Sequence, residues 1–255
     1  MKLIAAVAPH IDKSRPARVL DVGCGTGGIA RELASHLTLQ VKSYLGIDLS
    51  KEMIAIARTN SRSDNIEFMQ GDAEELPVAP GSFDLALSNS ALHWLNQPSL
   101  GSTPARAFRE IARSLSSGAV FGASLAAVGT GRKFRRSYLE VMEKAQRSVA
   151  DFESAKFMRD PIGCVHLHEA VDWASTAGMK VLFARMDYEP VAFARSVDYC
   201  DAVRAYGYSV FMAAVPERLK EDIWRDVCRT FMDSQPPGPY LHDQYMCYLV
   251  TSKVA

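Results

Sequence analysis

The chain has 255 residues and a mass of 28.0 kDa, enough for one sizeable α/β core, alone or with an insertion. Basic and acidic residues number 29 each, so the formal net charge is zero and neither nucleic acid nor an anionic membrane is favoured as a partner. A hydrophobic content of 48% without a run of roughly 20 apolar residues argues against disorder and against a membrane span.

The start of the sequence lacks the apolar core and small-residue cleavage site of a secretory signal, which favours the cytoplasm. The cysteines are odd in number, widely spaced and free of any Cys-x-x-Cys pair, so we expect reduced thiols. His166 and His168 have metal-like spacing, but no third ligand is recognisable, and no metal site is predicted.

From Arg18 onward, short β-branched runs alternate with amphipathic helical patterns, which is typical of a parallel sheet with helices on both faces. Strands are predicted at Arg18 to Val22, Tyr44 to Asp48, Ile66 to Gln70, Phe83 to Ser88, Ala119 to Leu125, Val181 to Met186 and Tyr245 to Val250. The fold class is therefore α/β, with a seven-stranded, mostly parallel, Rossmann-like sheet.

Helical patterns fill the intervals between the strands. Ile29, Leu33 and Leu37 share one face of a helix, and Ser50 can cap the next one. Thr103 followed by Pro104 marks a further helix start. We expect a single domain over 1–255, interrupted by a helical insertion at 129–165 and carrying a late helical section at about 196–240.

The first strand leads into a glycine-rich turn. Gly23, Gly25 and Gly28 satisfy G-x-G-x-x-G, a loop whose missing side chains let backbone amides approach a ligand at a helix N-terminus. Nicotinamide and flavin enzymes share this pattern, and such a turn can also be purely structural. Asp21 changes the balance, because a carboxylate there would repel a pyrophosphate and favour a cationic ligand, although it could simply cap the loop.

Three further segments place polar groups at strand ends. Asp48 ends the second strand and is the usual kind of acceptor for a ribose diol. Asp72 follows the third strand and could accept from an adenine amino group or act as a helix N-cap. Asn89 to Trp94 follow the fourth strand, so they belong to the same edge of a parallel sheet as the glycine turn.

In order along the chain, these motifs resemble class I S-adenosylmethionine-dependent methyltransferases of the type 11 group, especially trans-aconitate and malonyl-carrier-protein methyltransferases. The resemblance is strong over Arg18 to Leu125. Four motifs carry it: Leu20-Asp21-Val22-Gly23-Cys24-Gly25-Thr26-Gly27, Gly46-Ile47-Asp48-Leu49-Ser50, Gly71-Asp72-Ala73 and Ser88-Asn89-Ser90-Ala91-Leu92-His93-Trp94-Leu95. The later part, through Val203-Arg204-Ala205-Tyr206-Gly207, is similar more loosely.

The resemblance implies S-adenosylmethionine as cofactor and a small molecule as methyl acceptor, with a carboxylate as the leading choice. It makes 1–128 the cofactor-binding half and 166–255 the substrate-side half with a helical lid. It implies that Gly23, Cys24 and Gly25 contact the methionine moiety, close to Asp21, and that the carbonyl of Asn89 lies near the amino group. The ribose is expected at Asp48 and Leu49. Adenine is expected beside Met53, with Asp72 and Ala73 at its polar edge.

Two departures from the family pattern concern the lid. Ser116-Ser117-Gly118 replaces the usual Pro-Gly-Gly, and fewer than about twenty residues precede the first motif, so the N-terminal covering helix is expected to be short. Closure then depends on the insertion and the late helices.

A sulfonium donor carries its own leaving group, so the protein mainly needs to position the acceptor. Aromatic rings could contact the sulfonium or simply belong to the core; the candidates are Trp94, Tyr199, Tyr206, Tyr208 and Phe211. His93 could take a proton from a hydroxyl or amine acceptor, whereas a carboxylate acceptor needs no base.

Basic residues could orient an anionic acceptor. Arg204 is the preferred residue, because its segment resembles the lid. The run of Arg132, Lys133, Arg135 and Arg136 could do the same or form a solvated basic turn.

Three other functions remain open. The acceptor could be the oxygen or nitrogen of a natural-product-like metabolite. A nicotinamide oxidoreductase is disfavoured by Asp21 and by the lack of a recognisable Tyr-x-x-x-Lys pair. A non-catalytic protein that binds or assembles around S-adenosylmethionine would retain the same cofactor motifs.

Overall fold

The computed structural model describes residues 2–36, 39–61, 63–96, 104–148, 163–212 and 215–254. These divide into two compact units. Unit 1 comprises 1–127, 165–187 and 246–255, and unit 2 comprises 128–164 and 188–245. The insertion and the late helices thus fall in the same unit.

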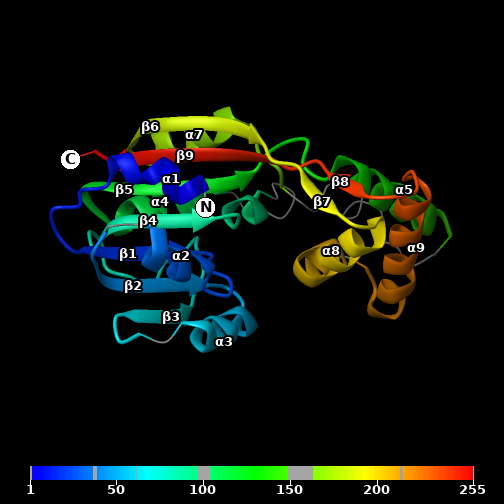
Figure 1. Ribbon diagram of the computed structural model, residues 1–255, viewed down its shortest axis with the longest axis horizontal. Helices are drawn as coiled ribbons and strands as arrows, with labels where there is room; N and C mark the ends of the chain where they lie inside the picture. Colours follow the sequence, from blue (N-terminus) through cyan, green and yellow to red (C-terminus); the bar gives the residue numbers. More distant parts are fainter. Residues whose placement is uncertain are drawn as a thin grey trace. The chain divides into compact units, whose positions relative to one another are not determined.

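Unit 1 contains the seven-stranded sheet, in the order β3-β2-β1-β4-β5-β9-β6 (Figure 1). The strands are β1 (Ala17–Val22), β2 (Val41–Asp48), β3 (Ile66–Gln70), β4 (Phe83–Asn89), β5 (Leu115–Ala126), β6 (Met179–Tyr188) and β9 (Tyr245–Lys253). β1 to β5 pair in parallel, whereas β9 runs antiparallel to β5. The predicted mostly parallel, Rossmann-like sheet is confirmed.

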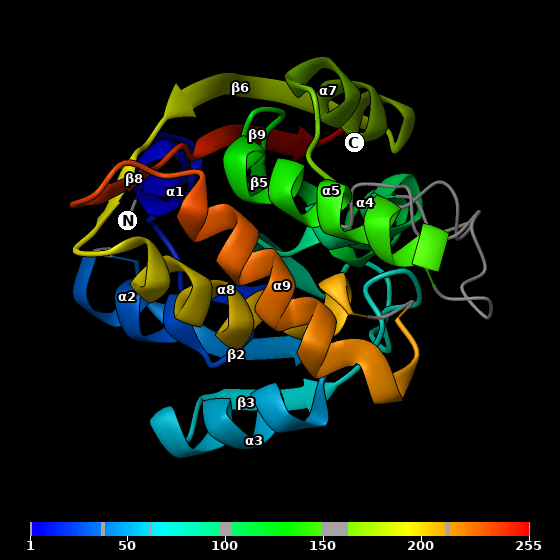
Figure 2. The same ribbon diagram turned by 90° about the vertical axis from the view of Figure 1, so that its right-hand side faces the viewer.

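Helices of unit 1 are α1 (Lys2–Val7), α2 (Gly28–His36), α3 (Lys51–Asn60), α4 (Pro104–Ser114) and α7 (Leu167–Thr176), with short 3-10 turns η1 (Ala8–His10) and η2 (Leu92–Leu95). In both views α3 lies along β3 at one edge of the sheet, and α7 lies beside β6 at the other (Figures 1 and 2). Ile29 and Leu33 are buried on α2 as predicted, whereas Leu37 and Thr103 lie outside the described residues.

Local chemistry explains two of these helices. The Ser50 side chain accepts a hydrogen bond from the Met53 amide at 3.2 Å and so caps α3, as predicted. On α4, residues spaced three and four apart are fully buried, and Phe108 packs edge to face against Phe121 of β5 and near Trp173 of α7. The N-terminal helix α1 is short, and its Val7 packs so closely on β5 that a Cβ at Gly122 would meet it at 2.2 Å.

Unit 2 combines α5 (Arg132–Ser148), α8 (Ser196–Phe211) and α9 (Lys220–Asp233) with a 3-10 turn η4 (Glu217–Leu219) and a two-stranded sheet, β7 (Val191–Phe193) with β8 (Tyr240–His242). α5 packs against α9 (Figure 2). Its core is aromatic, because Phe134 lies within 6 Å of four other rings: Tyr199, Phe211, Trp224 and Phe231.

The sequence analysis missed the small sheet of unit 2. β7 and β8 are three residues each, and they are separated along the chain by α8 and α9, so no hairpin signal marks them. It also placed the start of β5 at Ala119, whereas the strand begins at Leu115 and passes through Gly118, whose φ of 74° falls in the left-handed region. Within the described residues, no helix is long and apolar enough to cross a bilayer.

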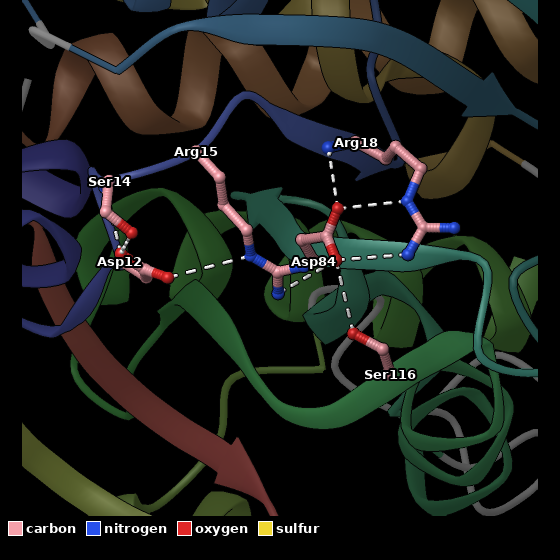
Figure 3. A network of polar contacts seen from close by, with 6 residues as sticks. All are labelled: Asp12, Ser14, Arg15, Arg18, Asp84 and Ser116. Carbon is pink, nitrogen blue, oxygen red and sulfur yellow. Dashed lines mark hydrogen bonds and ion pairs between the residues drawn. The ribbon is translucent and has the colours of Figure 1, made fainter.

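Asp84 joins three strands at the end of the sheet where β1, β4 and β5 begin (Figure 3). Its carboxylate accepts from the Arg18 amide at 3.0 Å and from Nε and Nη2 of the same side chain at 2.9 and 3.0 Å. Ser116 donates to it at 3.3 Å, and Arg15 lies 3.5 Å away. These contacts, led by the bonds from Arg18, lower the pKa of Asp84 to about 2.

We expect Asp84→Asn to lower the free energy of unfolding by about 1–2 kcal/mol at neutral pH, because the Arg18 pair is only partly exposed. A carboxyl whose folded pKa is depressed stabilises the protein above its unfolded pKa, near 4, and loses that contribution as the pH falls towards 2. Urea unfolding at pH 7 and near pH 2 measures the difference. Asp12→Asn is the matched control, since Asp12 is an exposed partner of Arg15, and equal losses in both variants would contradict the assignment.

Candidate functional site

A pocket of about 220 Å³ lies in unit 1 where the parallel strands end. Four chain segments line it: Val22 and Gly23 after β1, Ile47 to Leu49 at the end of β2, Gly71 to Ala73 after β3, and Ala91, Leu92, Trp94 and Leu95 after β4. Its position at the carboxyl edge is where open α/β sheets bind ligands. The pocket is somewhat smaller than the ~300 Å³ at the lower end of typical ligand sites.

The glycine turn holds its shape by hydrogen bonds within the protein. The amides of Gly23 and Cys24 both donate to the Ile47 carbonyl, at 2.8 and 3.0 Å, and the Gly25 amide donates to Asp48 Oδ2 at 2.8 Å. The sequence predicts amides that are free to approach a ligand, whereas in the structure the amides of Gly23, Cys24 and Gly25 all donate within the protein. There is open space beside the Gly25 Cα, since a Cβ there would meet no atom within 4 Å.

Asp21 is 1% exposed, and Tyr44 on the neighbouring strand donates its hydroxyl to Asp21 Oδ2. The other oxygen, Oδ1, is buried without a hydrogen-bond partner in the described chain. Burial raises the pKa of Asp21 to about 7; the Tyr44 hydrogen bond opposes this rise and the negative charge of Asp48 adds to it. Burial and the Asp21 charge raise the pKa of the Tyr44 hydroxyl well above its usual range.

Asp48 forms hydrogen bonds to both the glycine turn and the residue that caps α3. Besides the Gly25 amide, it accepts from the Ser50 amide at 2.9 Å through Oδ1, so it fixes both the glycine turn and the start of α3. An ionised carboxylate has about four acceptor positions, and two are used here. Asp48 lines the pocket and can still accept from a ligand.

The remaining residues expected around a nucleoside divide into two groups. Leu49 lines the pocket with 65% of its surface exposed, and Ala73 lines it beside Asp72. Met53 is half-buried on α3 and is not among the pocket-lining residues. No helix follows Asp72: its Oδ1 accepts from the Glu74 amide at 2.8 Å and its carbonyl from Glu75, so it closes a tight turn and is not a helix N-cap.

The end of β4 is fixed to β5 through a serine. Ser124 donates its hydroxyl to Asn89 Oδ1 at 2.7 Å, and its carbonyl accepts from the Ser90 amide at 3.0 Å. Ser90 has a φ of 56°, the one non-glycine residue of the described chain in the left-handed region. This strained turn directs the chain from β4 into the segment that lines the pocket.

The two aromatic residues of that segment have different surroundings. Trp94 lines the pocket, whereas the neighbouring His93, with its ring 5.0 Å away, is 4% exposed and is not among the lining residues. Burial lowers the pKa of His93 to about 4, and its Nδ1 has no partner in the described chain. His93 is thus a neutral, weak base near neutral pH.

Apart from Trp94, the residues expected to bind the acceptor belong to α8 in unit 2. Arg204 donates to both oxygens of Glu221, at 2.8 and 2.9 Å, and its guanidinium lies 4.7 Å from the Tyr208 ring centre. Tyr208 donates to the same Glu221 at 2.6 Å. The side chain of Tyr206 lies outside the described part of the structure. Tyr199 and Phe211 are 3% and 1% exposed and belong to the unit 2 core.

Sequence reasoning missed Tyr44 and Ser124. Tyr44 could have been found only with the register of β1 and β2, in which Asp21 pairs with Gly46. Ser124 gives no signal, because one serine in an apolar strand is unremarkable. None of the five cysteines forms a disulfide.

Comparison with known proteins matches residues 20–122 to the family model described as a methyltransferase domain. The malonyl-[acyl-carrier protein] O-methyltransferase of Geobacter sulfurreducens is 34% identical over 148 residues, which are 58% of this chain and 52% of that protein. The chain spans about half the length of the relatives of this kind that it matches.

Two solved structures show how widely the fold is used. A candidate methyltransferase from Bacillus halodurans superposes with a TM-score of 0.63 at 19% identity, over 100% of this chain and 98% of that one. A [4+2]-cyclase superposes with a TM-score of 0.58 at 23% identity, over 100% of this chain and 81% of that one. At these identities the likeness concerns the fold alone.

Proposed function

Because residues 20–122 match the family model described as a methyltransferase domain, we propose that the protein is a class I methyltransferase of the type 11 group, which binds S-adenosylmethionine in the unit 1 pocket and transfers its methyl group to a small carboxylate. The observation that carries the proposal is the pocket edge itself. Two acids, Asp21 and Asp48, stand at the ends of adjacent strands, and the glycine-turn amides between them are already donating inside the protein.

This arrangement fits a cationic ligand better than a dinucleotide. A pyrophosphate needs free N–H donors and no nearby negative charge. Here the amides of Gly23, Cys24 and Gly25 are engaged, and the Asp21 carboxylate lies near the end of the strand that leads into the turn. The buried oxygen Asp21 Oδ1 lacks a donor, and the ammonium of a nucleoside amino acid would supply one, directly or through water.

The other residues of the edge would hold the nucleoside. Asp48 would accept from the ribose hydroxyls with Leu49 against the sugar, and Asp72 and Ala73 would face the adenine edge with Met53 beside the ring. The carbonyl of Asn89 would lie near the amino group of the methionine moiety. S-adenosylmethionine bound there would supply a methyl group on a positively charged sulfur.

The choice of a carboxylate acceptor rests on the protonation chemistry of the edge. A carboxylate is ionised at neutral pH and needs no base. His93, the histidine expected at this edge, is buried with a pKa of about 4, so it is poorly suited to deprotonate a hydroxyl or an amine. Methylation of a metabolite oxygen or nitrogen remains the alternative.

Four residues are proposed to recognise the acceptor. Trp94 lines the unit 1 pocket, and Arg204, Tyr206 and Tyr208 would belong to the acceptor side on α8. Arg204 would have to exchange Glu221 for an acceptor carboxylate, and its exposed position keeps that exchange inexpensive. The absence of disulfides among the five cysteines favours a reducing compartment such as the cytoplasm.

Calorimetric titration of the purified chain tests the cofactor half of the proposal. We expect S-adenosylmethionine and S-adenosylhomocysteine to bind and NADH not to bind. Transfer of labelled methyl to a panel of carboxylic acids, with the corresponding methyl esters as controls, tests the acceptor half. Preferential binding of NADH would refute the family-based function, whereas S-adenosylmethionine binding without label transfer to any acceptor would favour a non-catalytic binding protein.

A further inference from the structure

Unit 2 contains a second pocket, formed by the first two turns of α5 and the chain that precedes it. It encloses about 280 Å³ and is lined by Val128, Gly129, Arg132, Arg135, Arg136 and Leu139. We call it the arginine pocket. It contains none of the residues assigned to the cofactor or the acceptor.

Helical spacing puts four of these side chains on one face. Arg132, Arg135, Arg136 and Leu139 are related by steps of three and four residues, which align along a helix. The opposite face of α5 carries Phe134 and Tyr138, which are buried in the aromatic core of unit 2. The core therefore fixes which face of α5 turns towards the pocket.

Arg135 is anchored in place, whereas its two neighbours are not. Its Nη1 donates to the Thr130 carbonyl and to the Cys164 sulfur, each at 3.2 Å. Arg132 and Arg136 are exposed and form no ion pair or hydrogen bond with any residue that the structure describes. Like charges spaced this way on a helix repel one another, so an anion placed among them would relieve the repulsion.

Apolar surface continues the pocket beyond the guanidinium groups. Leu139 and Val128 leave 36% and 42% of their surface exposed, and both line the pocket. A basic turn that serves only solubility needs no apolar floor. Arginine also binds carboxylate and phosphate oxygens in a planar, bidentate manner.

We propose that the arginine pocket binds an amphipathic organic anion, with its carboxylate or phosphate held by Arg132 and Arg136 and its hydrocarbon chain against Leu139 and Val128. None of its lining residues lines the unit 1 pocket proposed for S-adenosylmethionine.

Calorimetry with the full chain tests this, using octanoate, octyl phosphate, octan-1-ol and acetate as probes. We expect one or both octyl anions to bind at least about tenfold more tightly than octan-1-ol or acetate, since head and tail are both recognised. The tighter of the two anions identifies the head group. If neither octyl anion binds more tightly than octan-1-ol and acetate, the proposal is overturned.

A charge-matched pair of variants locates the site. Arg136→Gln should weaken the preferred anion at least about tenfold, whereas Lys133→Gln, which removes the same single positive charge, should change its affinity less than about twofold. Lys133 is on the same turn, but its ammonium lies 5.7 Å from the Tyr240 ring and it does not line the pocket. Equal losses of anion affinity in the two variants would show that the effect comes from net charge alone, and this would refute the site. Titration of S-adenosylhomocysteine into both variants, expected to be unaffected, reports separately on unit 1.

Discussion

We expect Gly23→Ala to weaken S-adenosylmethionine binding by at least about 100-fold, which corresponds to ~3 kcal/mol. Gly23 has a φ of 71°, which costs an alanine about 1 kcal/mol. Its new Cβ would also lie 2.2 Å from the Cβ of Ala91. Gly23 and Ala91 both line the pocket, so relieving the clash must move either the glycine turn or the segment after β4.

Gly81→Ala is the matched control for this prediction. Gly81 has nearly the same backbone angle, with a φ of 68°, but a Cβ there would meet no atom within 4 Å and the residue does not line the pocket. It should lose about 1 kcal/mol of stability and keep its cofactor affinity. Calorimetry and thermal unfolding of both variants separate strain from site disruption. Equal cofactor affinity in the two variants would contradict the role given to the Gly23 contact.

The contact between Gly23 and Ala91 shows what sequence reasoning could and could not reach. The glycine pattern predicts a tight turn after β1, and alternating strands and helices predict that β4 ends at the same edge, as observed. The sequence does not contain the distance between the two segments. That distance depends on the turn at Ser90 and on its bonds to Ser124, which lies 34 residues further along the chain.

Asp21 and Tyr44 illustrate the same limit. Charge alone predicts that a carboxylate near the end of β1 repels pyrophosphate, and this prediction needs no coordinates. The hydroxyl that contacts Asp21 comes from β2, two residues before the position that pairs with it. Register depends on the packing of whole strands, so a tyrosine in a strand pattern predicts burial but not its partner.

Unit 2 was the least predictable part, for a different physical reason. Its helices follow from their apolar periodicity, but β7 and β8 are too short to carry an alternating pattern, and their pairing joins segments on either side of two helices. The basic run, which the structure places in the first two turns of α5, could be interpreted from the sequence as either a solvated turn or an anion site. The pocket geometry, with Leu139 beside the arginines, favours the second interpretation.

The second large effect is expected from Asp21→Asn, which should stabilise the protein without ligand while impairing cofactor binding. Burial raises the pKa of Asp21 from 3.8 to about 7, so the folded state holds this proton more tightly than the unfolded state does. A carboxyl raised in this way makes folding less favourable as the pH rises from about 4 to about 7, and the full penalty applies above that range.

The size of the stabilisation follows from the same shift. About three pKa units correspond to roughly 4 kcal/mol. The asparagine amide must still find partners and recovers only part of that, so we expect about 2 kcal/mol of added stability at pH 8 and little change near pH 4. Tyr44 can still donate to the remaining amide oxygen. Urea unfolding at the two pH values measures the difference, and loss of stability at pH 8 would contradict the assigned pKa.

Cofactor binding should change in the opposite direction. The ammonium of S-adenosylmethionine would lose a charged acceptor worth about 1.5–3 kcal/mol, so affinity should fall between about tenfold and 100-fold at pH 8. In the wild-type protein the affinity should rise between about pH 6 and 8 as Asp21 ionises, and Asp21→Asn should lose that rise. Asp64→Asn makes the same chemical change at an exposed carboxylate before β3 and should alter neither property. If Asp21 only capped the turn, neutralising it would destabilise the protein and leave the pH profile of binding unchanged. Higher stability together with weaker, pH-independent binding therefore distinguishes a ligand-directed carboxylate from a structural one.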